Sequence, residues 1–227
     1  MNVRIEHATK GPPDVHIDLE TASDNDVRVR DALALLGGLT SSNGIWVHGT
    51  DEQSDAAMRS EGFASDRTLL QMRRALPTET GGLDTEPLDL SADLDIAELV
   101  EVNNRAFAWH PEQAGLTIEA ARDTFSEAWF DPDGVRLVRR NESLAGFCWT
   151  KIHDSPERIG EIYVICVDPA FHGQGLGRPL TLAGLEWLSG RGLEAAMLYV
   201  ESDNLPAVRT YESLGFVTTR FDKLWHR

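Results

Sequence analysis

Residues 161–178 of the chain read EIYVICVDPAFHGQGLGR, and this stretch decides the fold. An apolar run ends at Asp168–Pro169, three glycines then alternate with other residues, and Pro179 opens the next segment. Proline is tolerated in the first turn of a helix, because its missing N–H has no intrahelical partner there. The stretch therefore predicts a strand, a glycine loop and a helix that begins near Leu176.

The glycine loop has the composition of an anion-binding site. With no side chains at Gly173, Gly175 and Gly177, backbone N–H groups can converge on an anion, and the helix N-terminus adds its partial positive charge. Arg178 adds a formal charge, so the loop suits a pyrophosphate. On the glycines alone, a Rossmann dinucleotide site or a flexible turn is also possible. Glu201, which follows the next predicted strand, leaves the Rossmann alternative open.

A second block, YVESDNLPAVRTYESLGF at 199–216, begins within that next strand. It places Asn204 at a helix start, Pro206 in the first turn and Tyr211 seven residues after the Asn. Together the two blocks resemble the GNAT superfamily of N-acetyltransferases, which use acetyl-CoA. The resemblance implies an α/β fold, a mixed sheet with helices, in which the strands flanking the glycine loop splay apart. The pantetheine arm of the cofactor would lie between those strands.

The resemblance also assigns the cofactor contacts and one departure from the family. Most GNAT proteins have Gln or Arg where His172 stands, so a fixed cation is lost unless the imidazole is charged. The acetyl and pantetheine end would contact Ile165, Cys166 and Val167. The pyrophosphate would contact His172, Gly173, Gln174, Gly175, Leu176, Gly177 and Arg178. Asn204, Leu205, Pro206, Ala207, Val208 and Arg209 would lie along the cofactor.

Two residues are candidates for proton transfer. An ammonium nucleophile must lose a proton before it attacks a thioester, and Glu161 at the start of the strand can take that proton directly or through a water. CoA leaves as a thiolate, and the Tyr211 phenol can protonate it. The alternatives are a solvated strand-end carboxylate and a tyrosine that only packs in the core.

Several C-terminal stretches, among them VNNRAFAWHPEQ (102–113), WFDPDG (129–134) and GFCWTKIH (146–153), closely resemble the mycothiol synthase family. Its members acetylate the cysteinyl amine of desacetylmycothiol and have two GNAT lobes, of which the C-terminal one is catalytic. The resemblance makes Glu161 the general base and Tyr211 the general acid. It places Lys151, Tyr199 and Glu112 at the acceptor, although a surface role is equally plausible for Lys151 and Glu112. Two departures are Trp109, where a small residue is expected, and Cys166.

The chain contains an internal repeat. IWVHGTDEQSDAAMRSEGF at 45–63 aligns without a gap with LYVESDNLPAVRTYESLGF at 198–216, an offset of 153 residues. No glycine lies between Gly11 and Gly37, and Met58 stands where the second copy has Tyr211. We therefore expect a partial, non-catalytic GNAT-like lobe at 1–77, a linker at 78–87 and a catalytic GNAT domain at 88–227.

The elements expected in the C-terminal domain follow from apolar periodicity and turn residues. Tryptophans 109, 129 and 149 could wall a sugar pocket, but core packing is the better interpretation for at least two of them. The expected helices span 93–108, 117–129, 176–189 and 205–214. The expected strands span 135–140, 144–153, 161–167, 196–201 and 216–224.

The composition restricts the partners. Lys plus Arg number 21 against 37 Asp plus Glu, a net charge of −16, so we expect neither nucleic acid nor a membrane as the main partner. The two cysteines, Cys148 and Cys166, lie in apolar runs and are expected to be reduced in a cytoplasmic protein. No apolar stretch follows the charges of the first ten residues, so we expect no signal peptide. We expect acetyl-CoA as cosubstrate, a small amine as acceptor and no metal.

Three functions therefore remain open on the sequence. The first is acetylation of desacetylmycothiol, the second is the same chemistry on another small amine, and the third is a non-catalytic acyl-CoA-binding module. The presence of both Glu161 and Tyr211 favours the two enzymatic functions, because a binding module needs neither a base nor an acid.

Overall fold

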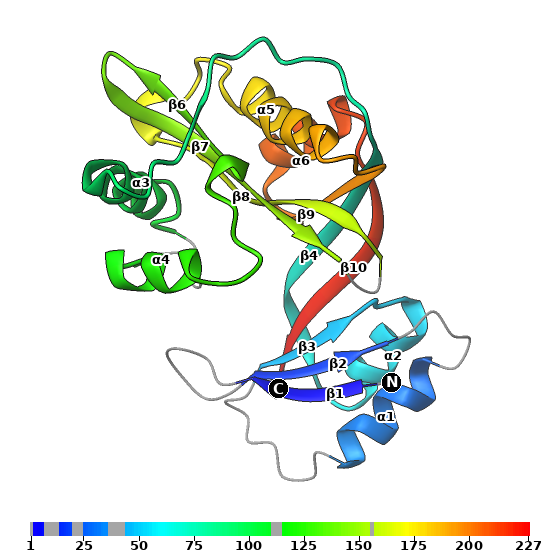
Figure 1. The fold of residues 1–227 in the computed structure, drawn as a ribbon. Coiled ribbons are helices and arrows are strands. Elements are labelled where there is room, and N and C mark those ends of the chain that lie inside the picture. Colours follow the sequence, from blue (N-terminus) through cyan, green and yellow to red (C-terminus); the bar gives the residue numbers. More distant parts are fainter. Residues whose placement is uncertain (1, 7–13, 20–24, 36–43, 110–114, 155–156) are drawn as a thin grey trace. The chain divides into compact units, whose positions relative to one another are not determined.

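The chain folds into two compact units, which Figure 1 shows in a computed structural model. The structure describes residues 2–6, 14–19, 25–35, 44–109, 115–154 and 157–227. Unit 1 comprises residues 1–72, 199–209 and 217–227, and unit 2 comprises 73–198 and 210–216. The predicted domain division at residues 77 and 88 stays a prediction.

Unit 2 is built on a mixed sheet with the strand order β9-β8-β7-β6-β5. Its neighbours pair antiparallel except for β8 and β9, which pair parallel. A Rossmann fold has a mostly parallel sheet, whereas β7 pairs antiparallel with both β8 and β6, so that alternative is wrong and the mixed α/β sheet is confirmed. The strands are β5 (Glu86–Pro87), β6 (Val135–Arg140), β7 (Ser143–His153), β8 (Ile159–Val167) and β9 (Ala195–Glu201).

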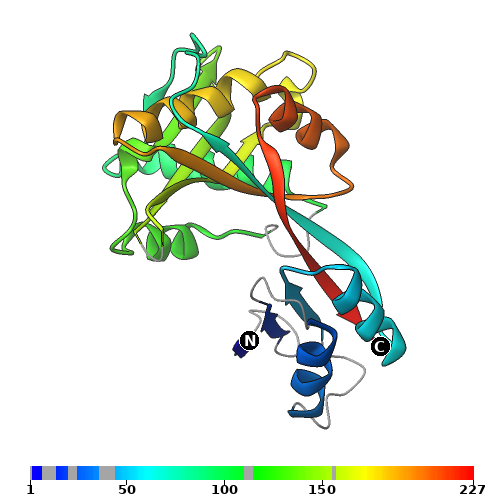
Figure 2. The same cartoon turned by 90° about the vertical axis from the view of Figure 1, so that its right-hand side faces the viewer.

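Helices cover both faces of this sheet (Figure 2). Helix α5 (Gly177–Gly190) packs on one face, where Gly184 lies against Cys148. Helices α3 (Asp93–Ala106) and α4 (Ile118–Phe125) lie on the other face. Apolar side chains from α3, β6 and β7 form the core on that side, among them Leu99, Val102, Leu137 and Phe147.

Helix α4 begins as predicted but ends earlier. Thr117 caps it, since its Oγ1 accepts a hydrogen bond from Ala120 N at 3.1 Å. The sequence predicted a helix to residue 129, but α4 stops at Phe125 and tighter turns follow, with Phe130 N bonded to Glu127 O. These turns allow the rings of Phe125 and Phe130 to approach to 4.7 Å, so aromatic packing overrides helical periodicity here.

The strands expected at 135–140 and 144–153 form as β6 and β7 and pair as a hairpin. Asn141 and Glu142 connect the strands with φ angles of 51° and 66°. Two consecutive positive φ values are those of the mirror-image turns that match the right-handed twist of paired strands. The turn therefore fixes the register of β7, the strand that carries Lys151 and His153.

In unit 1 the strands follow the order β1-β2-β3-β10-β4. Strands β2 and β3 pair parallel, and β3 pairs antiparallel with β10. The core contains Val15, Ile45, Met58 and Trp225. The elements are β1 (Asn2–Glu6), β2 (Asp14–Asp18), α1 (Asn25–Leu35), β3 (Ile45–His48), α2 (Glu52–Ser60), β4 (Ala64–Ala75) and β10 (Val217–His226).

The two copies of the repeat exchange their last strands within unit 1. With the offset of 153 residues, α2 falls on α6 (Leu205–Ser213) residue for residue, and the start of β4 falls on the start of β10. Yet β10, from the second copy, pairs with β3 of the first. In turn Arg67 of β4 forms an ion pair of 2.5 Å with Glu201 of β9. His48 of β3 and the buried Asp222 of β10 add a contact of 2.9 Å.

The close packing of α5 on the sheet of unit 2 predicts an effect on stability. A Cβ added at Gly184 would lie 2.5 Å from Cys148 Sγ and 2.9 Å from Ile162 Cδ1, whereas one added at Gly190 of the same helix meets nothing within 4 Å. Gly184→Ala should lower the free energy of unfolding by about 1–3 kcal/mol through overpacking. Gly190→Ala, the control, should cause no loss of stability.

Chemical denaturation followed by circular dichroism measures both variants. Equal midpoints for the two variants would contradict the packing of α5 described above.

Candidate active site

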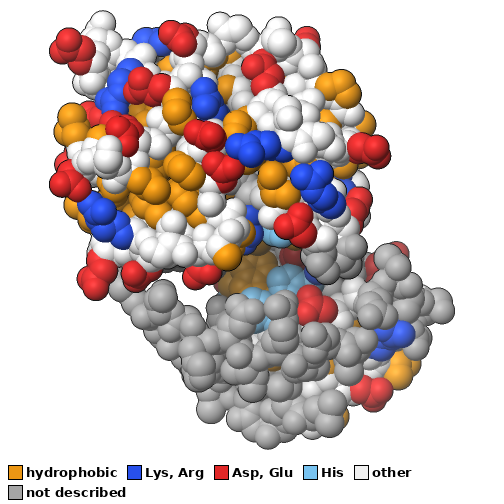
Figure 3. Space-filling model, viewed as in Figure 1, with side chains coloured by type: hydrophobic (Ala, Val, Ile, Leu, Met, Phe, Trp, Pro, Cys, Tyr) orange, Lys and Arg blue, Asp and Glu red, His pale blue; other side chains and the backbone are white. Residues whose placement is uncertain are grey.

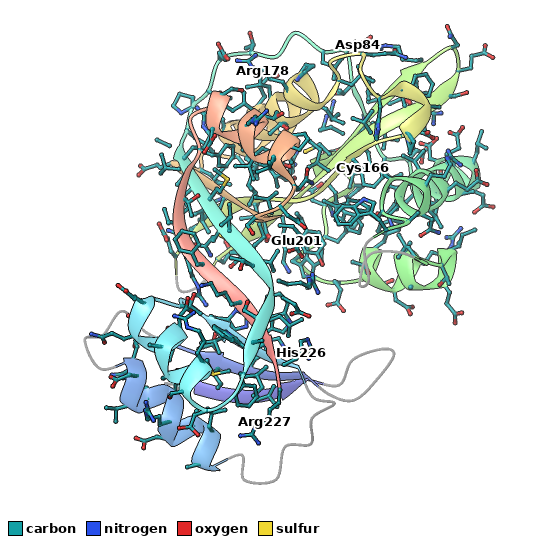
Figure 4. The ribbon with its side chains drawn as sticks, turned by 180° about the vertical axis from the view of Figure 1, so that it is seen from behind. Asp84, Cys166, Arg178, Glu201, His226 and Arg227 are labelled. Carbon is teal, nitrogen blue, oxygen red and sulfur yellow. The ribbon has the colours of Figure 1, made fainter. Side chains whose placement is uncertain are left out.

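The predicted site residues divide between the two units. Unit 2 holds both proton-transfer candidates, Lys151, the end of β8 and the glycine loop; in Figure 4, Cys166 lies in β8 and Arg178 at the start of α5. Unit 1 holds Tyr199 and residues 204–209. Glu112 lies outside the described residues.

Strand β8 has an edge that lacks a strand partner. Its pairing with β9 covers only Gly160, Glu161 and Ile162, opposite residues 196–198. The remainder of β8, through Val167, stays paired with β7 on its other side. Beyond Ile162, the edge of β8 that faces away from β7 has no ladder partner among the described residues. Unpaired backbone groups on a strand edge are ready to bind an extended ligand.

The glycine loop joins this edge to the start of α5. Gly173 and Gly175 have φ angles of 77° and 71°, and a Cβ at either of them or at Gly177 would meet nothing within 4 Å. Leu176, at the N-cap of α5, makes no side-chain capping bond, so the first N–H groups of the helix have no side-chain cap. Open backbone donors at the start of a 14-residue helix favour an anion.

Two side chains fix the start of this loop. Arg105 of α3 contacts Asp168 with Nη2 at 2.6 Å from Oδ2. Burial opposes ionisation, but hydrogen bonds from Ala170 N–H and Arg105 keep the pKa of Asp168 below its usual value. The His172 ring turns back to the strand, where Nε2 lies 3.0 Å from the Val167 carbonyl oxygen and donates to it. His172 therefore stabilises the loop rather than directing its ring to an anion.

The predicted cation of the loop already has a partner. Arg178 forms an ion pair with Glu79, and Gly81 N–H donates to the carboxylate of Glu186 in α5. Residues of the predicted linker therefore pack along α5 within unit 2. Both side chains of the Arg178–Glu79 pair are exposed, so the pair contributes little to stability.

Glu161 is buried and faces the side of the sheet that α3 and α4 cover. It stands opposite Lys151 in the β7–β8 ladder, and the register shifts between Trp149 and Thr150. The extra residue on β8 is Tyr163, a bulge that places its ring 5.3 Å from that of Trp129 on the same face as Glu161. Bulges of this kind reorient side chains next to active sites.

Lys151 lies against aromatic rings. Its Nζ is 4.1 Å from the ring centroid of Trp129 and 5.2 Å from that of Tyr163, a cation–π arrangement. Trp129 and Trp149 pack into the core, as expected for two of the three tryptophans, while Trp109 is 61% exposed.

Sequence analysis missed a partner of Glu161. His153 Nε2 lies 2.6 Å from Glu161 Oε2. The two residues are eight positions apart and meet only because β7 and β8 pair in this register. The one available signal was the alternation in β7, which places His153 on the same side as Lys151.

Tyr211 lies on the α5 side of the sheet. It is 7% exposed, and its ring contacts that of Phe216 at a centroid distance of 5.9 Å. Burial, with a contribution from Cys148, raises the pKa of its phenol, which therefore stays protonated. Burial also raises the pKa of the Cys148 thiol to about 12. A sulfur anion in these surroundings is thus a strong base.

In unit 1, two of the predicted contacts have defined partners. Gln71 Nε2 donates to the Tyr199 hydroxyl at 2.6 Å. Asn204 lies at the start of α6, where its Oδ1 accepts from Ala207 N at 3.3 Å. Met58, the counterpart of Tyr211 in the first copy, is fully buried in the core of unit 1.

The comparisons with known proteins agree with this geometry. Residues 96–216 match the family model described as the acetyltransferase (GNAT) family. The chain therefore belongs to the GNAT acetyltransferase family.

Similar sequences come from mycothiol acetyltransferases. The mycothiol acetyltransferase of Mycobacteroides abscessus is 43% identical over 88% of this chain and 68% of its own length. That of Thermomonospora curvata is 46% identical over 80% of this chain and 62% of its own. These matches confirm the resemblance to the mycothiol synthase family. The chain spans about two thirds of the length of the curated relatives it matches.

Solved structures confirm the fold. A GCN5-related N-acetyltransferase from Sphaerobacter thermophilus aligns over 94% of this chain and 72% of its own, with a TM-score of 0.70 at 15% identity. A tandem GNAT protein from the clavulanic acid pathway aligns over 99% of this chain and 78% of its own, with a TM-score of 0.59 at 13% identity.

None of the described helices has the length and hydrophobicity to cross a membrane. Among the described residues, no group of three or more His, Cys, Asp or Glu is placed to hold a metal ion. On the visible face of unit 2, Figure 3 shows acidic and basic side chains interspersed around an apolar area.

The loop geometry predicts how a substitution affects CoA binding. An alanine at a positive φ costs about 1–2 kcal/mol. Gly175→Ala should therefore weaken CoA binding about tenfold, because the strained loop turns its N–H groups away from the anion. Gly192→Ala is the matched control, with φ 75° and an equally open site remote from the loop.

Isothermal titration calorimetry with CoA compares the two variants with the unmodified chain. Equal affinities for the Gly175 and Gly192 variants would remove the loop from the binding site.

Proposed function

We propose that this chain is an acetyl-CoA-dependent N-acetyltransferase, and that its acceptor is the cysteinyl amine of desacetylmycothiol. The observation that carries the proposal is the position of Glu161 and Tyr211 in unit 2. Glu161 lies on the α3/α4 face of the sheet, and Tyr211 lies on the α5 face. The open edge of β8 begins after Ile162, the residue that follows Glu161. A base for the acceptor and an acid for the leaving group are thus held apart by the strand that would bind the thioester.

The residues of unit 2 fit acetyl-CoA. The unpaired edge at Ile165, Cys166 and Val167 can pair with the amides of an extended pantetheine arm, as in strand addition. The glycine loop and the start of α5 present backbone donors to a pyrophosphate. When bound, acetyl-CoA supplies an activated acetyl group with a thiolate leaving group. The assignments of Tyr199 to the acceptor and of residues 204–209 to the cofactor stay predictions from the resemblance.

The protein's own groups then handle the protons. Glu161 takes a proton from the acceptor ammonium, which frees the nitrogen lone pair for attack on the acetyl carbonyl carbon. Tyr211 gives its proton to the departing sulfur. Burial raises the pKa of a thiol, as it does for Cys148, and so makes the thiolate a stronger base. The buried Tyr211 phenol can therefore protonate the departing thiolate although the pKa of the phenol is raised as well.

The acceptor side of the site combines a carboxylate with an aromatic wall. Lys151, held over Trp129 and Tyr163, lies opposite Glu161 in the ladder and offers hydrogen bonds to hydroxyl groups of a sugar or inositol. Aromatic rings and a cationic donor suit a polyhydroxylated acceptor better than a plain alkyl amine. The identity of that acceptor rests on the relatives named mycothiol acetyltransferase.

An amine panel tests the proposed function. We expect acetyl-CoA-dependent thiol release with desacetylmycothiol, and at least tenfold lower kcat/KM with cysteine, glucosamine and spermidine, since one lost set of polar contacts costs about 1.4 kcal/mol or more. Thiol release detected by a disulfide reagent, after subtraction of the acceptor's own thiol, measures the rates. Thiol release with another amine but not with desacetylmycothiol would show that the other amine is the acceptor. No thiol release with any amine would favour a non-catalytic acyl-CoA-binding module.

The role of Tyr211 predicts a defect in kcat. Tyr211→Phe removes one hydroxyl from a buried ring, so we expect kcat to fall about 100-fold, in the range of general acid catalysis, with little change in the binding of acetyl-CoA. Steady-state kinetics and a thermal melt of the same preparation separate catalysis from stability. An unchanged kcat would exclude Tyr211 as the acid.

A further inference from the structure

Proton balance raises a question about Glu161. An ammonium acceptor loses two protons as it becomes an amide, and the leaving thiolate takes only one of them. The other proton must reach water in every turnover. The Glu161 side chain is only 9% exposed, so it has little direct contact with solvent through which to lose that proton.

His153 connects this carboxylate to the surface. Its Nε2 lies 2.6 Å from Glu161 Oε2, and its side chain is 30% exposed. The other charged group of this neighbourhood, Lys151, lies opposite Glu161 in the ladder but directs its ammonium to the rings of Trp129 and Tyr163. Among the contacts described for the Glu161 side chain, the imidazole is thus the one that can both accept and release a proton.

We propose that His153 is the proton exit of the active site and positions Glu161 as well. Once Glu161 has taken a proton from the acceptor, it passes that proton to His153 Nε2, and His153 releases the proton on Nδ1 to water. Exchange with water then moves the proton of the neutral ring from Nε2 back to Nδ1, so Nε2 can accept again and the Glu161 carboxylate is ready for the next acceptor. No electrons move, and one proton leaves per turnover. This assignment rests on the proposed acetyl transfer.

Chemical rescue tests the assignment. His153→Ala should lower kcat about tenfold, less than the loss expected for a catalytic base because water replaces the ring in part. Imidazole at millimolar concentration should restore kcat, since it can enter the space of a partly exposed ring and carry the proton. A side chain that only packs or holds Glu161 in place would show the loss without the rescue, and that result overturns the proposal.

Two further variants make the test specific. His153→Gln keeps a hydrogen-bond donor for Glu161 but cannot transfer a proton, so it should lose the same tenfold; full activity in this variant overturns the proposal even where the alanine variant fails to fold. Glu161→Gln removes the base itself and should not respond to imidazole. His226→Gln is the matched control, an exposed histidine that is paired with Asp66 in unit 1, and it should keep full activity.

The outcomes separate this assignment from the proposed function. If the unmodified chain acetylates desacetylmycothiol and the His153 variants equal it, the proton exit is wrong and the acetyltransferase stands. If the unmodified chain acetylates no amine, the proposed function falls and the assignment of His153 falls with it.

Discussion

The parallel pairing of β8 with β9 ends after three residue pairs, and the site in unit 2 depends on that end. Were the ladder to continue to Val167, the backbone groups of the strand would be satisfied and no extended ligand could pair with them. The antiparallel ladder with β7 keeps the same residues rigid. A strand edge that is open on one side and held rigid on the other suits an extended cosubstrate, because the strand loses little conformational entropy when the cosubstrate binds.

Unit 1 contains the corresponding parallel strands of the first copy of the repeat, but these strands leave no open edge. Its parallel strands β2 and β3 pair along the whole of β3, from Ile45 to His48, so no edge opens there. Met58 fills the position that Tyr211 occupies in the second copy, and it lies wholly within the core. Among the described residues, the open edge and the buried phenol thus belong to the second copy, and the sequence of the first copy has no glycine between Gly11 and Gly37.

The sequence predicted the fold of unit 2 well because its signals are local. Glycines, a proline in the first turn and apolar alternation each depend on a few neighbouring residues, and β6, β7 and α5 begin and end within one residue of the predicted bounds. The features that the sequence analysis got wrong or missed depend on side-chain packing and on contacts between residues far apart in the chain. Helix α4 ends early because aromatic packing outweighs its periodicity, and the pairing of Arg178 with Glu79 joins residues 99 positions apart. The contact between His153 and Glu161 needs the register of two strands, which composition does not supply.

The placement of Glu161 and Tyr211 on opposite faces of the sheet follows from these constraints. In the proposed mechanism, the base acts on the acceptor nitrogen and the acid acts on the leaving sulfur, so the two groups serve different atoms. Here the strand β8 separates them: the bulge at Tyr163 keeps Glu161 on the α3/α4 side, and the helix that carries Tyr211 keeps the phenol on the α5 side. In the proposed mechanism, the proton taken from the acceptor and the proton given to the leaving sulfur therefore travel by different routes. The partly exposed His153 beside Glu161 would carry the first proton out, and the buried Tyr211 phenol would give the second.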